Sequence, residues 1–373
     1  MGFKTKSLLA SLVAVLVLSG ASCLSLSGQS QGIVGMFRTD NKGDAWKAIA
    51  AYPTLQGVKS LAGLNVFRLY FDPSDPNAIY LATRGQGLYY SYDNGESWDF
   101  VDGLGNFYAY GLVVDPQDKC TIYVSDGPHI YKTEDCLRSW KLIFTEERSS
   151  ERFVGLAVDY KNSKIIYGAE INGDILRSQD AGLSWRIVKR FGLGLREIAV
   201  DPQTNKIYVA SYEKGLFSSV DGAENWTDLS ADFAKYSNSE KYNRLVFNSA
   251  KKDSLFWVSK YGILRSDDAG KTWQDLKLLT PPGGVNIYAF AVNPQNDKEI
   301  YYTGTILDSK NQNLKSTFYR TSDGGTNWVT KRLPTNTVPV NMFVHTKNSS
   351  MIFLGFTMLE EGQSKNSAGQ YGI

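Results

Sequence analysis

The chain has 373 residues, of which 42% are hydrophobic, 13% aromatic and 21% charged. Its 40 basic and 38 acidic side chains give a formal net charge of +2, which provides no electrostatic reason to expect a nucleic acid as partner. The length alone suggests two or three domains, but a repeat that runs through nearly the whole chain favours a single large one.

The first 22 residues differ in composition from the rest of the chain. Two lysines precede an apolar run from Leu8 to Leu18, and small residues follow as far as Ser22. This order is typical of a secretory signal peptide. The run is shorter than the about 20 residues that a membrane span needs, with an uncleaved anchor as the alternative. We therefore predict export, with residues 1–22 outside the folded domain.

Cys23 follows the small residues Gly20, Ala21 and Ser22. This stretch resembles the lipobox of bacterial lipoproteins, in which the cysteine is lipidated and becomes the new N-terminus. The usual leucine three residues before the cysteine is here Gly20. We expect lipidation at Cys23, a polar tether over 23–31 and a membrane-anchored protein of the cell envelope. The alternative is a secreted protein whose signal is cut near the same point.

Seven times a stretch with a hydroxyl residue, an acid and usually a glycine ends on tryptophan, first in TDNKGDAW and last in TSDGGTNW. Neighbouring copies are 41 residues apart at their closest, from Trp185 to Trp226, and 55 at their widest, from Trp273 to Trp328. Such a period is that of one propeller blade. The only other tryptophan in the chain is Trp257.

Residues 66–98 show one full repeat. An alternating run to Asp72 is followed by a turn, by a second strand ending at Thr83, by a third at 87–91 and by the tryptophan motif, after which a fourth strand must begin. We predict an all-β fold over 32–373, a single seven-bladed propeller of four-stranded antiparallel blades.

The repeat and the motif are out of phase at the two ends of the chain. The repeat that starts at Val340 has two strands but no tryptophan motif, whereas residues 35–46 have the motif without the strands that should precede it. We predict that one blade combines strands from both ends, which removes the open edge of the ring. The alternative is a longer protein, because residues 368–373 resemble the approach to a third strand.

Cys120 and Cys136 remain as a pair if Cys23 carries a lipid. The first falls in the turn between two strands and the second in a tryptophan motif, and in an up-and-down blade those turns share a face. An exported protein retains disulfides, so we predict this bridge, with two free thiols as the alternative. Closing a loop of about 15 residues contributes on the order of 3 kcal/mol.

The seven motifs resemble the Asp-box, or bacterial neuraminidase repeat, of form Ser/Thr-x-Asp-x-Gly-x-Thr/Ser-Trp. The residues at the Asp position are Asn41, Asp93, Asp135, Asp180, Asp221, Asp268 and Asp323. Proteins with this repeat include sialidases, xyloglucanases, sortilin-type receptors and photosystem II assembly factors, and the chain resembles the last two groups most. The resemblance implies a propeller and leaves the activity open.

We expect the Asp-box carboxylates to be structural. An aspartate can accept hydrogen bonds from the amides of its own turn, glycine supplies the positive φ, and tryptophan packs between sheets. Each copy has one regular acid and no cluster of oxygen ligands, so we predict no metal site and no cofactor. The only histidines, His129 and His345, lie far apart in the repeat pattern.

One position in the first strand of each repeat varies as a binding site would. It holds Arg68, Glu197 and Arg244 in three repeats and an uncharged residue in the other four. These side chains should line the central channel, where they would grip a carboxylate, a peptide end or an acidic glycan, or pair with one another. Tyr110 and Tyr288 are further candidates for a pocket, with core packing as the alternative.

From these features we predict a monomeric, exported and lipid-anchored module that binds or assembles an envelope protein, peptide or glycan without catalysis. The site should lie at the channel mouth or in loops that break the repeat, such as 307–317. One alternative is a glycoside hydrolase that uses two carboxylates about 5 to 9 Å apart. Sialidase motifs are absent, and xyloglucanases of this type resemble two propellers flanking a cleft. A purely structural surface protein is the third possibility.

Overall fold

The computed structural model describes residues 32–310 and 313–359, all of which belong to a compact unit that begins at Gly32. The predicted signal peptide, the tether and Cys23 lie outside the described residues. In the described part we find no helix with the length and hydrophobicity that a membrane crossing requires. The described secondary structure is β-strand apart from one short 3-10 helix, η1 (Ala231–Lys235).

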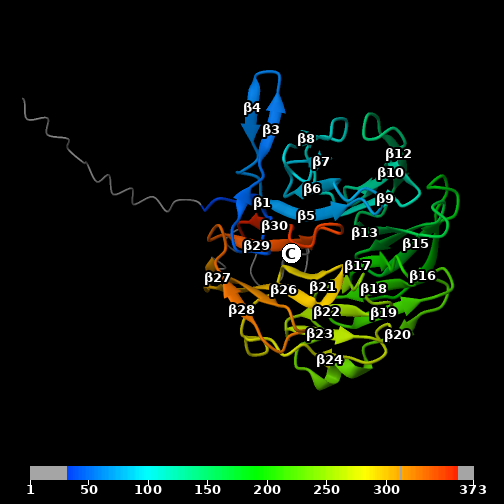
Figure 1. Cartoon of the computed structure of the whole chain (residues 1–373). Helices are drawn as coiled ribbons and strands as arrows, with labels where there is room; N and C mark the ends of the chain where they lie inside the picture. Colours follow the sequence, from blue (N-terminus) through cyan, green and yellow to red (C-terminus); the bar gives the residue numbers. More distant parts are fainter. Residues whose placement is uncertain (1–31, 311–312, 360–373) are drawn as a thin grey trace, which may run out of the picture. The chain divides into compact units, whose positions relative to one another are not determined.

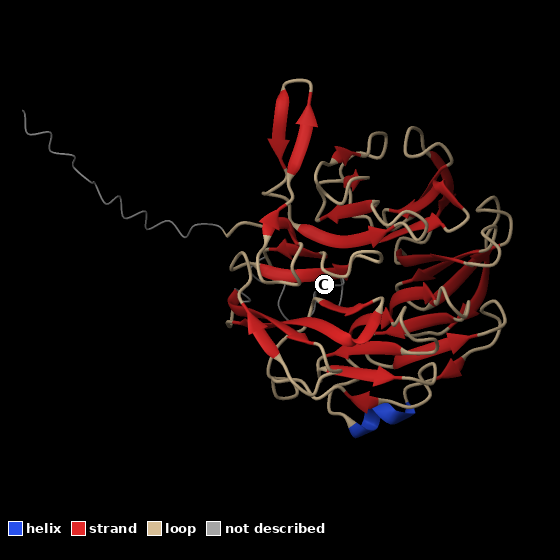
Figure 2. Ribbon diagram, viewed as in Figure 1, coloured by secondary structure: helices blue, strands red, loops and turns tan. Residues whose placement is uncertain are grey.

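Seven four-stranded antiparallel sheets surround a central channel (Figures 1 and 2). Six blades are continuous in sequence: β5–β8 (Val66–Phe71, Ile79–Thr83, Leu88–Ser91, Asp99–Phe100), β9–β12 (Gly111–Asp115, Asp118–Ser125, His129–Thr133, Lys141–Thr145), β13–β16 (Phe153–Val158, Ile166–Glu170, Asp174–Ser178, Arg186–Arg190), β17–β20 (Leu195–Val200, Ile207–Ser211, Gly215–Ser219, Thr227–Asp228), β21–β24 (Tyr242–Phe247, Leu255–Ser259, Ile263–Ser266, Gln274–Asp275) and β25–β28 (Phe290–Asn293, Asn296–Leu307, Asn313–Thr321, Val329–Lys331).

The seventh blade joins the two ends of the described chain. Its strand order is β2-β1-β30-β29, with β1 (Gly35–Thr39) and β2 (Lys47–Ala48) from the N-terminal side and β29 (Val338–Val344) and β30 (Ile352–Thr357) from the C-terminal side. Strand β1 pairs with β30 in antiparallel register, Phe37 opposite Leu354. The predicted seven-bladed fold and its closure by strands from both ends are confirmed.

Two hairpins depart from the predicted repeat. An additional pair, β3 (Ala51–Thr54) and β4 (Gly57–Ser60), forms a separate two-stranded sheet that projects from the ring (Figure 1). The segment 307–317, predicted as an irregular loop, lies mostly in β26 and β27, which pair as far as Leu307 and Asn313.

The core lies between neighbouring blades. The second strand of each blade buries one aromatic ring at an equivalent place, and each of these rings is at most 1% exposed: Tyr80, Tyr123, Tyr167, Tyr208, Phe256, Tyr301 and Phe353. Indoles of the tryptophan motifs connect blades, since Trp98 Nε1 donates to Ile49 O at 2.9 Å and Trp273 Nε1 to Leu229 O at 3.2 Å. The repeat therefore positions a set of inner strands around the channel with little variation.

The tryptophan-motif turns contain the hydrogen bonds expected of a self-bonded aspartate. Asp180 accepts from Ser184 N at 2.9 Å, Ser184 Oγ at 2.6 Å and Ser178 Oγ at 2.8 Å. Led by the Ser184 hydroxyl, these donors hold the pKa of Asp180 at about 2. A disulfide joins Cys120 to Cys136 and so fastens one such turn to strand β10.

Candidate functional site

The channel has two ends with different loops. We call "box face" the end that carries the tryptophan-motif turns and the turns between first and second strands. The "connector face" is the opposite end, which carries the turns between second and third strands and the connections between blades. This assignment follows from the antiparallel order of strands within every blade.

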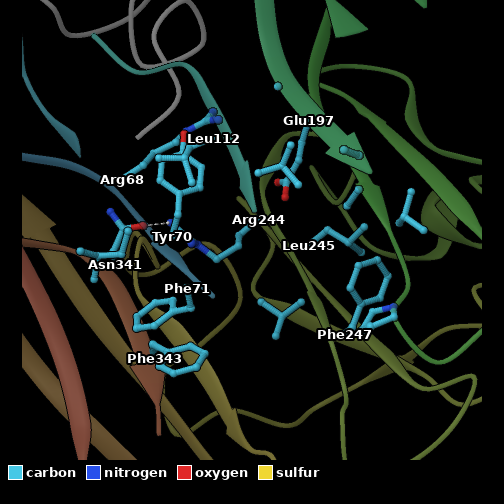
Figure 3. Close-up of a pocket in the computed structure, with 18 of the residues that line it drawn as sticks. Arg68, Tyr70, Phe71, Leu112, Glu197, Arg244, Leu245, Phe247, Asn341 and Phe343 are labelled. Carbon is cyan, nitrogen blue, oxygen red and sulfur yellow. Dashed lines mark hydrogen bonds between the residues drawn. The ribbon is translucent and has the colours of Figure 1, made fainter. Parts of the chain in front are cut away.

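The inner strands β5, β9, β13, β17, β21, β25 and β29 surround a cavity of about 450 Å³ (Figure 3). Arg68, Glu197 and Arg244 all line it, as the repeat alignment predicted. The cavity extends to the box face, where its lining includes Tyr160 and Pro202 from turns that follow the inner strands. Its volume is within the about 300–1,000 Å³ of small-molecule sites.

Both guanidinium groups are bound by carbonyl oxygens of neighbouring inner strands. Arg68 Nη1 donates to Tyr110 O at 2.6 Å and to Val154 O at 3.1 Å. Arg244 Nη2 donates to Val340 O and to Asn341 Oδ1, each at 3.0 Å. The structure brings the three predicted residues together in one cavity, but neither arginine makes an ion pair with Glu197 within 4.0 Å.

Burial changes the protonation equilibria of this group. Desolvation raises the pKa of Glu197, against the attraction of Arg68 and Arg244. Desolvation also lowers the pKa of Arg244. The charged groups that line the cavity are two guanidinium groups and one carboxyl group.

Tyr110 and Tyr288, the other predicted ligand contacts, do not line this cavity. The Tyr110 ring packs at 5.7 Å from the Phe67 ring and lies 5.6 Å below the Arg152 guanidinium. Tyr288 is 9% exposed and belongs to the core near Val338, where burial raises its pKa to about 12. For Tyr288 the structure supports the alternative of core packing, because its ring is buried in the hydrophobic core.

A second cluster of charged groups lies on the connector face, in the third blade. Arg148, in the connection between β12 and β13, contacts three carboxylates: Nε lies 2.8 Å from Glu146 Oε1, Nη2 2.7 Å from Glu170 Oε2, and Nη1 2.8 Å from Asp174 Oδ2. Glu170 and Asp174 end and begin the strands on either side of one turn. We call these four residues the carboxylate cluster.

Two carboxyl groups of the cluster, those of Glu170 and Glu146, have pKa values that lie far apart. Burial, reinforced by its hydrogen bond with Glu146, raises the pKa of Glu170 to about 8. The hydrogen bond from Arg148 holds the pKa of Glu146 at about 2. The Glu170 side chain is 0% exposed and its Oε1 has no hydrogen-bond partner among the described residues, whereas Arg148 is 41% exposed and covers it. Pairs of carboxyl groups with separated pKa values are a mark of acid–base sites.

Sequence reasoning missed the carboxylate cluster, although one signal was present. Three other repeats place a buried hydroxyl where the third repeat has Glu170, namely Thr83, Ser211 and Ser259, and the second repeat has Asp126 there. In two of these blades the hydroxyl caps the following turn, as when Thr83 Oγ1 donates to Gly87 O at 2.7 Å. A longer carboxyl group, at a position where other repeats have a small capping hydroxyl, indicates a role other than capping the turn.

The described residues contain no group of three or more histidine, cysteine or acidic side chains that could hold a metal ion. His345 Nδ1 accepts from Lys347 N and Asn348 N, and His129 Nδ1 lies 3.0 Å from Asp126 Oδ2. The two histidines are thus used separately in local turns.

Comparison with known proteins relates the chain to glycoside hydrolases. No family model matches it. It is 24% identical over 269 residues to the oligoxyloglucan-reducing end-specific xyloglucanase of Emericella nidulans, covering 63% of this chain and 30% of the relative. It is 27% identical over 269 residues to xyloglucanase Xgh74A of Acetivibrio thermocellus, covering 65% of this chain and 28% of the relative.

Solved structures confirm the propeller fold. The GH74 xyloglucanase from Xanthomonas campestris superposes with a TM-score of 0.63 at 15% identity, over 84% of this chain and 52% of that one. A structure of YCF48 bound to D1 peptide gives a TM-score of 0.58 at 14% identity, over 79% of this chain and 94% of that one. The chain spans less than a third of the length of the curated relatives it matches.

The curated relatives contradict our prediction of a non-catalytic binding or assembly module, because both are named as xyloglucanases. They favour the glycoside hydrolase alternative. The prediction failed because tryptophan motifs stabilise the turns of enzymes and of binding proteins alike. In addition, the carboxylate cluster is assembled from two separate segments, the β12–β13 connection and the β14–β15 turn, and leaves no linear motif.

Proposed function

We propose that the protein is a single-propeller glycoside hydrolase that acts on a β-glucan of the xyloglucan class. The observation that carries this proposal is the agreement of the curated relatives, which match 62% to 65% of the chain and are named for one polysaccharide. The carboxylate cluster supplies the groups that such a reaction needs, on the face where the blade connections lie.

Hydrolysis of a glycosidic bond uses one protonated and one ionised carboxyl group. In this proposal Glu170, whose raised pKa of about 8 keeps it protonated at neutral pH, donates its proton to the leaving glycosidic oxygen. Asp174, held at the far end of the Arg148 guanidinium, takes a proton from the attacking water. The bond from the anomeric carbon to the leaving oxygen breaks as that from carbon to water forms.

Arg148 has a defined part in this arrangement. Its guanidinium contacts Glu170 and Asp174 through different nitrogens, so it sets their spacing and shields the acid from solvent. The side chain is anchored only by carboxylates among the described residues and is 41% exposed, so it withdraws without breaking the sheet. A saccharide that displaces it reaches the Glu170 proton.

Hydrolysis of a polysaccharide panel tests this proposal. The full chain is incubated with xyloglucan, cellulose and mixed-linkage glucan, and released reducing ends are counted. We expect release from xyloglucan, and a loss of kcat of about 100-fold or more in Glu170→Gln and in Asp174→Asn, because each removes one acid–base group.

Glu224→Gln is the matched control. Glu224 is also an ion-paired carboxylate, at 2.7 Å from Arg177 Nη2, but it belongs to a tryptophan-motif turn on the box face. Its replacement should leave kcat unchanged. Release of no reducing ends from any substrate, or equal losses in Glu170→Gln and Glu224→Gln, would overturn the proposal.

Export and membrane anchoring through Cys23 remain part of the proposal. A polymeric β-glucan is met outside the cell membrane, which agrees with a signal at residues 1–22. The relationship to Asp-box proteins is likewise proposed from the motifs, and turn hydrogen bonds such as those of Asp180 support it.

A further inference from the structure

The central cavity is separate from the carboxylate cluster and has its own charge pattern. Its charged lining residues are Arg68, Arg244 and Glu197, all near the end remote from the box face. Two cations and one carboxyl group leave at least one positive charge without a matching anion in the lining. Arg244 Nε is also buried without a hydrogen-bond partner among the described residues. Buried charge that lacks a counter-ion is costly, so an entering anion would be stabilised there.

The walls between this charged end and the box face are apolar. Phe71 and Phe343 stack with ring centroids 3.5 Å apart and an interplanar angle of 16°. Leu112 and Phe247 also line the cavity, on other inner strands (Figure 3). A saccharide would leave its hydroxyl groups without partners along such walls, whereas an alkyl or aryl body would remove apolar surface from water.

We propose that the channel cavity binds one carboxylic acid with an apolar body, of the medium-chain fatty acid class. The carboxylate binds at Arg68 and Arg244, and the apolar body lies along Phe71 and Phe343 towards the box face. One carboxylate supplies an anion that the lining lacks. Seven inner strands enclose the cavity of about 450 Å³. A cavity of this size suits a slender monoanion better than a folded polypeptide.

Calorimetric titration of the full chain with decanoate, below its micelle concentration, tests this site. We expect one decanoate per chain, with decan-1-ol and acetate each binding at least 10-fold more weakly, because the first lacks the charge and the second the apolar body. This ligand series uses the unmodified protein and does not depend on whether any variant folds. Equal affinities for decanoate and decan-1-ol, or no binding of decanoate, would overturn the proposal.

Variants locate the site. Arg244→Met keeps a long apolar side chain and should weaken decanoate binding at least 10-fold. The control is Arg265→Met, since Arg265 is a comparably covered arginine that pairs with Asp267 and Asp297 outside the cavity. Glu170→Gln should bind decanoate as the unmodified chain does. Loss of binding in Glu170→Gln or Arg265→Met, or its retention in a folded Arg244→Met, would contradict the channel as the binding site.

Discussion

Two residues take the left-handed backbone conformation where the motif ordinarily has glycine. Leu137 and Ala223 have φ values of 71° and 72°, close to the 78° of Gly95 at the equivalent place. An L-residue pays about 1–2 kcal/mol for this conformation. The hydrogen bonds of Asp135 and Asp221 to their own turns hold it, as Ser139 N donates to Asp135 Oδ1 at 2.9 Å and Asn225 N to Asp221 Oδ1 at 2.9 Å. The motif therefore tolerates loss of glycine as long as the side-chain acceptor remains.

The raised pKa of Glu170 makes stability depend on pH. Its pKa is about 8 in the folded protein against an ordinary 4.5, so the stabilisation from protonated Glu170 is complete below about pH 4.5 and is lost as the pH rises through 8. We expect Glu170→Gln to flatten the fall in the free energy of unfolding between pH 5 and pH 9. Urea unfolding at several pH values measures this. In Glu224→Gln the fall should persist, and an unchanged slope in Glu170→Gln would contradict a buried proton there.

Alignment of the repeats predicts the position of some site residues and misses others. Arg68, Glu197 and Arg244 occupy one repeat position, so alignment of the repeats alone placed them on a common ring. The carboxylate cluster joins a connection to a strand turn, and its members Glu146 and Glu170 share no repeat position. Their contact depends on side-chain direction and burial, which a single sequence does not contain.

At the scale of elements, the disulfide ties a strand to a turn that has no glycine. It links Cys120 and Cys136 at a sequence separation of 16. We expect Cys120→Ser/Cys136→Ser to lower the free energy of unfolding by about 3 kcal/mol, since the unfolded chain regains the entropy of the open loop. Urea unfolding with and without reductant measures this loss. Reductant should weaken the unmodified protein and leave the double variant unchanged; equal responses would mean that the bridge contributes nothing.

The regular strands followed from hydrophobic alternation and the turn residues, and the irregular elements did not. The hairpin β3–β4 interrupts the expected course between the closing blade and the next one, with both residues Leu55 and Val58 exposed. Because these apolar side chains are exposed, the hairpin lacks the alternation of apolar and polar residues by which a half-buried strand is predicted. Strand pairing across 307–317 was likewise missed because polar residues dominate that stretch.

At the scale of the whole molecule, the ring is closed by strands that lie about 300 residues apart in sequence, as in the pair Phe37 and Leu354. Phe37 is 6% exposed and packs edge-on against Phe356 at 5.3 Å. We expect Phe37→Ala to lower the free energy of unfolding by about 3–5 kcal/mol, because a large ring leaves the core. Urea unfolding followed by fluorescence and by far-ultraviolet circular dichroism should still give one coincident transition.

Leu264→Ala is the control for closure. Leu264 is fully buried on β23, the third strand of a blade that is continuous in sequence, and it lies two residues before the serine of its tryptophan motif, as Phe37 lies two residues before Thr39. Similar losses in the two variants would mean that the closing blade is as firmly bound as the others. A separate early transition in Phe37→Ala alone would contradict a ring that unfolds as one unit.

The sequence by itself determined the seven-bladed architecture, the composite blade and the cysteine pair, because a period repeated seven times averages out the ambiguity of any one strand. It also placed Arg68, Glu197 and Arg244 on one ring. Only the tertiary structure decided that both arginines are bound by backbone carbonyls, that Tyr288 is core, and that Arg148 gathers three carboxylates around a buried acid. Those outcomes depend on distances between segments far apart in the chain, which side-chain burial and the packing of neighbouring blades determine.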